Sequence, residues 1–220
     1  MPAPPFAAEA VLFDLDGVIA DSFDVWLAVL ADGRRKRGLP VLSAAEVRAI
    51  WGQGLLADCE TIFPGTRPQD LAREYEEGFA RHVARIRPVP GAPEVVGALR
   101  DRGFRLALVT NSPRAMTRRV LEALALDSAF ERIAAGDEVP RGKPDPALVR
   151  LALERLRVRP AAAVMVGDTP ADLEAASRAG VASIGYRLDG GDARIESLAE
   201  LPGRLVAREP VGESEDDVAP

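Results

Sequence analysis

An apolar run that leads into paired aspartates, Ala10-Val11-Leu12-Phe13-Asp14-Leu15-Asp16-Gly17-Val18, carries most of the structural information in this 220-residue chain. The run is typical of a buried strand that ends in a polar turn. Two carboxylates at such a strand end can provide a nucleophile and a metal site in one place. Alone, however, the pattern is weak, because acidic residues are common at strand ends and helix caps.

Three further segments strengthen this interpretation by following the paired aspartates in a fixed order. They are Leu108-Val109-Thr110-Asn111-Ser112, Gly142-Lys143-Pro144-Asp145-Pro146 and Val166-Gly167-Asp168-Thr169-Pro170-Ala171-Asp172. Hydrolysis of a phosphate monoester brings an anionic nucleophile to an anionic phosphoryl group, so its site needs a cation and fixed hydrogen-bond donors. Carboxylates, a hydroxyl group, a lysine and Mg²⁺ meet that need. The four segments together therefore indicate phosphoryl chemistry.

Lysine is rare in this chain, since only Lys36 and Lys143 among its 28 basic residues are lysines. Finding one of them within Gly-Lys-Pro-Asp-Pro favours a role for a compact point charge there, where the planar fork of arginine does not serve. The alternative is a chance surface lysine. Lys36 lies in a basic run that is typical of a solvated helix end.

The composition narrows the class of protein. A net charge of −6 and a pI near 5.0 argue against a nucleic-acid partner, whose phosphates need a basic face. The single cysteine, Cys59, cannot form an internal disulfide bond, and residues 1–5 lack the basic and apolar regions of a signal peptide. No apolar stretch is long enough to span a bilayer. We therefore expect a cytoplasmic protein with no membrane partner, either a monomer or a homodimer.

Short apolar runs alternate with amphipathic stretches along most of the chain. The predicted strands span residues 10–14, 105–110, 132–135, 163–167 and 181–186. The predicted helices between them span residues 93–102, 113–125, 146–157 and 170–178, with Pro113 at a first helical position and Thr169 as a cap. This alternation predicts an α/β fold: a Rossmann-like core with a parallel sheet and helices on both of its faces.

The polar residues of the four segments fall where apolar runs finish. Asp14, Thr110 and Asp168 end predicted strands, and Lys143 lies just beyond another. Because ligands bind beyond the carboxyl ends of strands in parallel sheets, we expect these side chains to meet at one edge.

Residues 21–88 break the alternation, because they show helical patterns without convincing strands. Helices are predicted at residues 24–37, 43–51 and 69–86, the second of which opens with a Ser43 and Glu46 capping box. We therefore predict a helical cap at 21–88 inserted into a discontinuous core of residues 1–20 and 89–208. The alternative is that these helices extend one core. Residues 209–220 form an acidic tail that is expected to be disordered.

The four segments, taken with the helical insertion, resemble the haloacid dehalogenase superfamily in its phosphatase branch. The resemblance covers about residues 9–187 and implies a cap that covers the site and selects the substrate. It also implies Mg²⁺ and a small phosphate ester as substrate. Dehalogenases of this superfamily generally lack the second acidic residue of the first segment, so Asp16 favours phosphoryl chemistry.

The resemblance also implies a role for each matching residue. Asp14 would be the nucleophile that forms an aspartyl-phosphate, and Asp16 the general acid and base. Thr110, Asn111 and Lys143 would bind phosphate, Thr110 through its hydroxyl group and Asn111 through its backbone N–H. The implied catalytic residues are thus Asp14, Asp16, Thr110 and Lys143.

Metal ligands are implied at Asp14, Asp16 and Asp168, with Asp16 acting through its backbone carbonyl. Asp172, one turn into the following helix, would orient Lys143 or a metal-bound water without contacting the metal.

Within the phosphatase branch, Ile50-Trp51-Gly52-Gln53-Gly54-Leu55 looks most like the corresponding region of phosphoglycolate phosphatases. A β-phosphoglucomutase-like phosphosugar mutase is the nearest alternative, although Leu55 stands where such mutases carry an arginine. A non-catalytic metabolite-binding protein on the same scaffold is a third possibility. All the catalytic residue types are present, which disfavours it.

Overall fold

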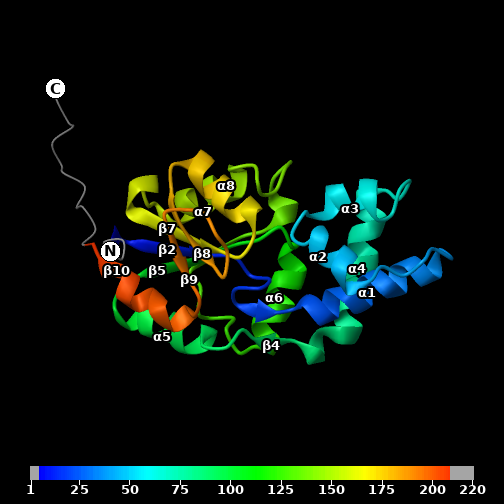
Figure 1. Ribbon diagram of the computed structural model, residues 1–220, viewed down its shortest axis with the longest axis horizontal. Coiled ribbons are helices and arrows are strands. Elements are labelled where there is room, and N and C mark those ends of the chain that lie inside the picture. Colours follow the sequence, from blue (N-terminus) through cyan, green and yellow to red (C-terminus); the bar gives the residue numbers. More distant parts are fainter. Residues whose placement is uncertain (1–4, 209–220) are drawn as a thin grey trace, which may run out of the picture.

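The computed structural model describes residues 5–208 and shows a layered α/β body with a group of helices at one side (Figure 1). The acidic tail at 209–220 lies outside the described residues, so its disorder stays a prediction. Within residues 5–208, no helix combines the length and the apolar character that crossing a membrane requires.

A six-stranded sheet of order β6-β5-β2-β7-β8-β9 forms the centre, and all of its strand pairs are parallel. Five strands lie within one residue of the predicted ranges at each end. They are β2 (Ala10–Phe13), β5 (Arg105–Val109), β6 (Arg132–Ala134), β7 (Ala163–Gly167) and β8 (Ala182–Tyr186). The predicted fold class is therefore confirmed.

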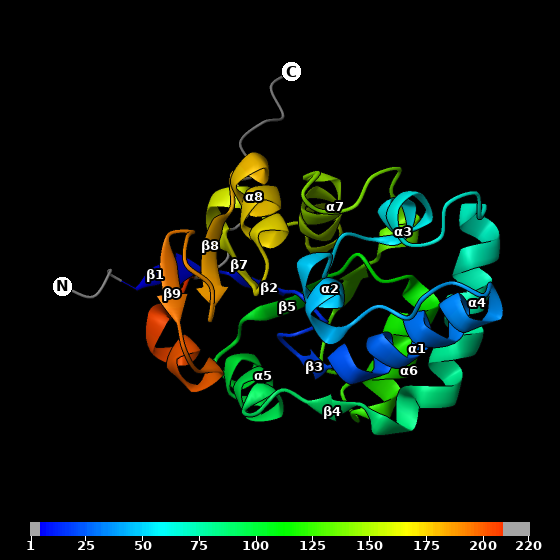
Figure 2. The ribbon, with the colours of Figure 1, turned by 45° about the vertical axis from the view of Figure 1, so that its right-hand side comes forward.

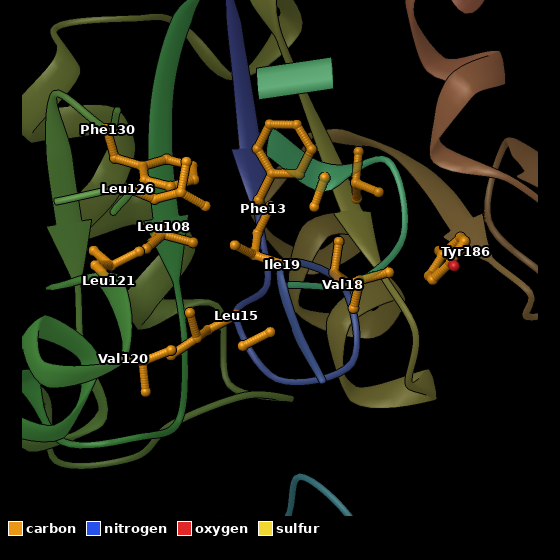
Figure 3. Close-up of a cluster of buried hydrophobic side chains, with 14 of the residues drawn as sticks. Phe13, Leu15, Val18, Ile19, Leu108, Val120, Leu121, Leu126, Phe130 and Tyr186 are labelled. Atoms are coloured by element: carbon orange, nitrogen blue, oxygen red, sulfur yellow. The ribbon is translucent and has the colours of Figure 1, made fainter. Parts of the chain in front are cut away.

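Helices cover both faces of this sheet, because side chains alternate along each strand. Val11 and Phe13 of β2 join the apolar cluster on the face covered by α5 (Ala92–Asp101) and α6 (Arg114–Ala123). Figure 3 shows part of this cluster around Phe13. Ala10 and Leu12 join a second cluster under α7 (Ala147–Leu156) and α8 (Pro170–Ala179). Figure 2 shows these two helices beside the sheet.

The ends of these helices follow local chemistry. Thr169 is the N-cap of α8, where its backbone N–H and its hydroxyl group both donate to Asp172 Oδ2, at 3.0 and 2.6 Å. Gly180 ends the helix in the left-handed conformation that glycine adopts readily. The prediction that Pro113 takes the first helical position is wrong by one residue. Pro113 has an extended ψ of 149° and serves as the N-cap of α6, since its carbonyl accepts the first helical hydrogen bond, from Thr117 N at 2.9 Å.

Four α-helices fill the segment that follows β2. They are α1 (Phe23–Lys36), α2 (Ala44–Ala49), α3 (Leu55–Thr61) and α4 (Pro68–His82), followed by a 3₁₀ turn at Val83–Arg85. The chain enters through β3 (Ala20–Asp21) and returns through β4 (Arg87–Pro88), which pair in antiparallel fashion. The predicted capping box of Ser43 and Glu46 is present.

Several elements were not predicted. Helix α3 follows Gly52 and Gly54, which indicate a loop, and it is only seven residues long. Strand β9 (Ala193–Ile195) and the parallel pair of β1 (Phe6–Ala8) with β10 (Leu205–Ala207) are three residues each. Runs this short show no clear alternation, so their pairing depends on tertiary contacts.

Candidate active site

The carboxyl edge of the sheet gathers the predicted residues. Asp14 directly follows β2, Thr110 follows β5 and Asp168 follows β7, as expected for parallel strands that end together. Lys143 reaches the same place from the loop between β6 and α7, and its ammonium group contacts Asp14 although the two residues are 129 apart in sequence.

Lys143 connects the acidic residues of this site. Its side chain is only 4% exposed, and all three of its N–H donors have partners. Its Nζ lies 2.7 Å from Asp14 Oδ1, 2.6 Å from Asp172 Oδ1 and 2.8 Å from the carbonyl oxygen of Val109. Burial favours the neutral amine, but the two carboxylates dominate and raise the pKa of Lys143 above its ordinary value. The lysine is therefore a fixed positive charge between two acids.

Three carboxylates converge beside this lysine. Oxygen atoms of Asp14, Asp168 and Asp172 all lie within 4.8 Å of one another. Burial, followed by repulsion from Asp172, raises the pKa of Asp168 to about 7 and raises that of Asp14 well above its usual range. Three acids next to one ammonium group leave an excess of negative charge.

The excess negative charge can be assigned to the Asp168 carboxylate. Asp168 Oδ1 is the one buried side-chain polar atom within residues 5–208 that has no hydrogen-bond partner. A buried carboxylate oxygen without a partner is costly, and a hard cation bound by oxygen ligands would satisfy it. The donor set and the unpaired oxygen therefore fit a metal ion.

Asp16 is held apart from this acidic cluster. Its Oδ1 accepts hydrogen bonds from the Ser22 hydroxyl group and from Trp26 Nε1 at 3.3 Å, and its Oδ2 accepts one from Ser112 Oγ at 2.8 Å. Of the predicted residues, the structure thus groups Asp172 with Asp14 and Asp168, while the Asp16 carboxylate faces the helical segment.

Two glycines keep these carboxylates close. Gly17 has φ +90°, a conformation that favours glycine, and a Cβ atom there would collide with the Asp168 carboxylate. A Cβ atom at Gly167 would likewise collide with the Asp172 side chain. The turn after β2 can therefore approach Asp168, and Asp172 of α8 can approach the end of β7, because glycine has no side chain at these two positions.

Thr110 and Asn111 occupy the loop after β5. Thr110 is buried, and its Oγ1 accepts a hydrogen bond from Ser112 N at 3.0 Å. The Asn111 side chain ties two loops together: its Nδ2 donates to the Gly52 carbonyl at 2.7 Å, and its Oδ1 accepts from Lys143 N at 2.7 Å. This side-chain clamp was not predicted, because nothing in the sequence indicates that Gly52 lies nearby.

A cavity joins the site to the helical segment. Asp14, Asp16 and Lys143 line one part of it, and side chains of α1, α3, α4 and the loop before α3 line the other. Aromatic residues at helical spacing usually indicate core packing, so the aromatic and polar lining of this cavity was not predicted. These unpredicted lining residues include Trp26, Trp51, Gln53, Asp58 and Tyr75.

Comparisons with known proteins agree with this architecture. The chain is 34% identical over 175 residues to a phosphoglycolate phosphatase from Aquifex aeolicus, which covers 77% of this chain and 80% of that protein. It is 29% identical to an N-acetylmuramic acid 6-phosphate phosphatase from Pseudomonas aeruginosa, over 81% of each chain. Among solved structures, CbbY from Rhodobacter sphaeroides in complex with phosphate superposes with a TM-score of 0.79 at 27% identity, covering 88% of this chain and 96% of that one.

The match to a protein family extends over most of the described chain. Residues 11–186 match the family described as haloacid dehalogenase-like hydrolase. This range includes the turn after β2, the whole helical segment and the ends of β5 and β7. The chain therefore belongs to the haloacid dehalogenase-like hydrolase family.

Proposed function

We propose that this protein is a Mg²⁺-dependent phosphatase that hydrolyses a small phosphate monoester through an aspartyl-phosphate on Asp14. The observation that carries the proposal is the arrangement around Lys143, which pairs with Asp14 at 2.7 Å and with Asp172 at 2.6 Å beside the unpaired Asp168 oxygen. A buried carboxylate with a fixed counter-charge, beside oxygen atoms that could bind a metal ion, suits attack on phosphorus.

In the first step, a carboxylate oxygen of Asp14 attacks phosphorus and the bond from phosphorus to the ester oxygen breaks. Asp16 acts as the general acid and donates a proton to the departing oxygen. In the second step, Asp16 accepts a proton from a water molecule that attacks phosphorus, and the Asp14 carboxylate leaves. The hydrogen bonds from Ser112 and Trp26 hold the Asp16 carboxyl group for both transfers.

Mg²⁺ would be held by the carboxylates of Asp14 and Asp168 and by the backbone carbonyl of Asp16. When bound, the ion offsets the negative charges of carboxylate and phosphate, which otherwise keep them apart. Asp172 contributes through Lys143, whose ammonium group it orients. Thr110 Oγ1, the backbone N–H of Asn111 and Lys143 would contact the phosphate oxygens.

The helical segment at 21–88 is proposed to act as the cap over a core of residues 1–20 and 89–208. Two side-chain contacts support this division, since Asn111 bonds to Gly52 and Trp26 bonds to Asp16 across the cavity. Relatives that are named phosphoglycolate phosphatases favour hydrolysis over a mutase reaction. The cytoplasmic location and the monomeric or dimeric state stay predictions.

The test is phosphate release from a panel of small phosphomonoesters, including phosphoglycolate and a hexose phosphate, in Mg²⁺ or in EDTA. We expect turnover that EDTA abolishes and that is lost in Asp14→Asn. The matched control Asp127→Asn changes an exposed aspartate and should keep full activity. Isomerisation of the hexose phosphate without phosphate release would instead support the mutase alternative.

A further inference from the structure

The cavity has two chemically different ends. Its catalytic end holds Asp14, Asp16 and Lys143, whereas its other end is formed by aromatic and aliphatic side chains of the helical segment together with Asp58 and Gln53. A phosphate bound beside Asp14 would direct the alcohol part of the ester toward this second end. The residues there should therefore determine which alcohol is accepted.

The charge of the second end is negative. Among the described residues that line the cavity, Lys143 is the sole cation, and it lies at the catalytic end, paired with Asp14 and Asp172. Of the lining residues at the second end within 5–208, Asp58 and the Tyr75 phenol are the only ionisable groups. A carboxylate on the substrate would find no positive charge there.

Asp58 is positioned by neutral partners alone. Its Oδ1 accepts a hydrogen bond from Gln53 Nε2 at 2.7 Å, and its Oδ2 accepts one from the Tyr75 hydroxyl group at 2.7 Å. No lysine, arginine or histidine of the part of the chain that the structure describes forms an ion pair with it. Burial raises the pKa of Asp58 above its ordinary value, as expected for a carboxylate that lacks a counter-charge.

Aromatic rings surround the same end. Trp26 and Tyr75 line the cavity in an edge-on pair with ring centroids 5.1 Å apart, and Phe79 packs behind Trp26 at 5.5 Å. Trp51, which also lines the cavity, packs on Phe23 at 5.1 Å. These contacts fix the positions of the rings. Aromatic rings attract cations, and together with a carboxylate they form a site that suits an organic ammonium group.

A separate hollow contains two basic groups. Arg48 and Arg187 line it together with Trp51 and Asp168, and the Arg48 guanidinium group lies 3.9 Å from the ring centroid of Phe23. Neither arginine lines the cavity that contains Asp58. Binding of a substrate carboxylate would therefore require a different direction of approach, toward Arg48.

We propose that the substrate is a phosphate monoester whose alcohol carries an ammonium group, which Asp58 and the rings of Trp26, Trp51 and Tyr75 would bind. This inference rests on the proposed phosphatase function and makes its substrate more specific. It departs from the substrate that the names of the relatives suggest, because phosphoglycolate would place a carboxylate against Asp58.

Three esters of similar size test the proposal: phosphoethanolamine, propyl phosphate and phosphoglycolate, whose alcohol parts are positive, neutral and negative. For the wild-type protein with Mg²⁺, KM should be lowest for phosphoethanolamine and highest for phosphoglycolate. This comparison needs no variant. A lower KM for phosphoglycolate than for propyl phosphate would overturn the inference and leave the proposed function intact. If Arg48→Gln then abolished this preference for phosphoglycolate, the substrate carboxylate would be assigned to the hollow that contains Arg48.

The variant Asp58→Asn removes the charge while keeping hydrogen-bonding atoms of the same shape. The ratio of kcat/KM for phosphoethanolamine to that for propyl phosphate should fall about tenfold, equivalent to about 1.4 kcal/mol. Comparing ratios between variants cancels the different intrinsic reactivities of the esters. Glu60→Gln, which neutralises an exposed acid on the same helix, is the matched control and should leave the ratio unchanged.

The possible failures can be distinguished. An unchanged ratio of kcat/KM values in Asp58→Asn would overturn the role of Asp58. An equal fall of this ratio in Glu60→Gln would also overturn it, because the effect would then come from the net charge of the protein. If the wild-type protein released phosphate from none of the three esters and from no ester of the wider panel, the proposed function would fail and this inference would fail with it.

Discussion

Replacing Asp168 by asparagine should stabilise the protein in the absence of metal and abolish its stabilisation by Mg²⁺. Asp168 Oδ1 is buried without a partner, and carboxylate oxygens of Asp14 and Asp172 lie within 4.8 Å of the Asp168 carboxylate. At an effective dielectric constant of about 20, two charges at such a distance repel by roughly 3 to 4 kcal/mol, which Lys143 offsets only in part. Asparagine removes this repulsion with almost no change of shape.

The pKa of Asp168 gives the size of the effect and its dependence on pH. Burial and Asp172 raise this pKa from 3.8 to about 7, so the folded protein holds the proton more tightly than the unfolded chain does. The metal-free wild-type protein should therefore lose stability as the pH rises through this window. Three pH units correspond to an upper limit of about 4 kcal/mol, and we expect a gain of about 2 kcal/mol for Asp168→Asn near pH 8 that disappears near pH 4.

Urea denaturation measures these differences directly. The wild-type protein, Asp168→Asn and the exposed control Asp127→Asn are unfolded in EDTA at both pH values, and then in Mg²⁺ near pH 8. With Mg²⁺ at about a hundred times its dissociation constant, the wild-type protein should gain about 2.7 kcal/mol and Asp168→Asn almost nothing. A variant less stable than wild type in EDTA near pH 8 would refute the argument from the unpaired charge. Equal stabilisation of both proteins by Mg²⁺ would exclude Asp168 as a ligand.

Three further changes test other parts of the structure. Burial opposes ionisation of Glu138, but Arg155 and Arg114 lower its pKa to about 2. Glu138→Gln should therefore lower the free energy of unfolding by about 1 to 2 kcal/mol near pH 7, and this loss should shrink as the pH falls from about 4.5 toward 2. A loss that did not depend on pH would contradict the ion pair. Gly17→Ala should destabilise the fold by about 1 to 3 kcal/mol in thermal unfolding and reduce Mg²⁺-dependent turnover, because φ is +90° and the new Cβ would collide with the Asp168 carboxylate; unchanged stability would show that the turn relaxes freely. Asn111→Ala removes the hydrogen bonds to Gly52 and to Lys143 and should lower kcat/KM at least about tenfold, whereas an unchanged value would show that the clamp has no functional part.

The sheet and its site could be predicted because their signals are local. The apolar run before Asp14 matches β2 almost residue for residue, and Thr169 is the N-cap of α8 as predicted. Parallel strands end at one edge, so placing the strands also placed the polar residues that follow them.

The far end of the cavity could not be predicted, because its signals are tertiary. Asp58 lies on α3, a short helix after two glycines, and its importance appears only when Tyr75 and Gln53 are seen to hold it. The same holds for Asn111, whose side chain bonds to residues 59 and 32 positions away along the chain. No local pattern marks such pairs.

The central claim is that Asp14 becomes phosphorylated during turnover, and acid quenching followed by peptide mass spectrometry tests it most directly. Protein mixed with an ester that it hydrolyses, in Mg²⁺, is quenched within a few turnovers and digested. The account predicts a phosphoryl adduct on the peptide that contains Asp14, lost on treatment with hydroxylamine and absent from Asp14→Asn and from samples in EDTA. Sustained phosphate release without any adduct, together with activity in Asp14→Asn, would contradict it.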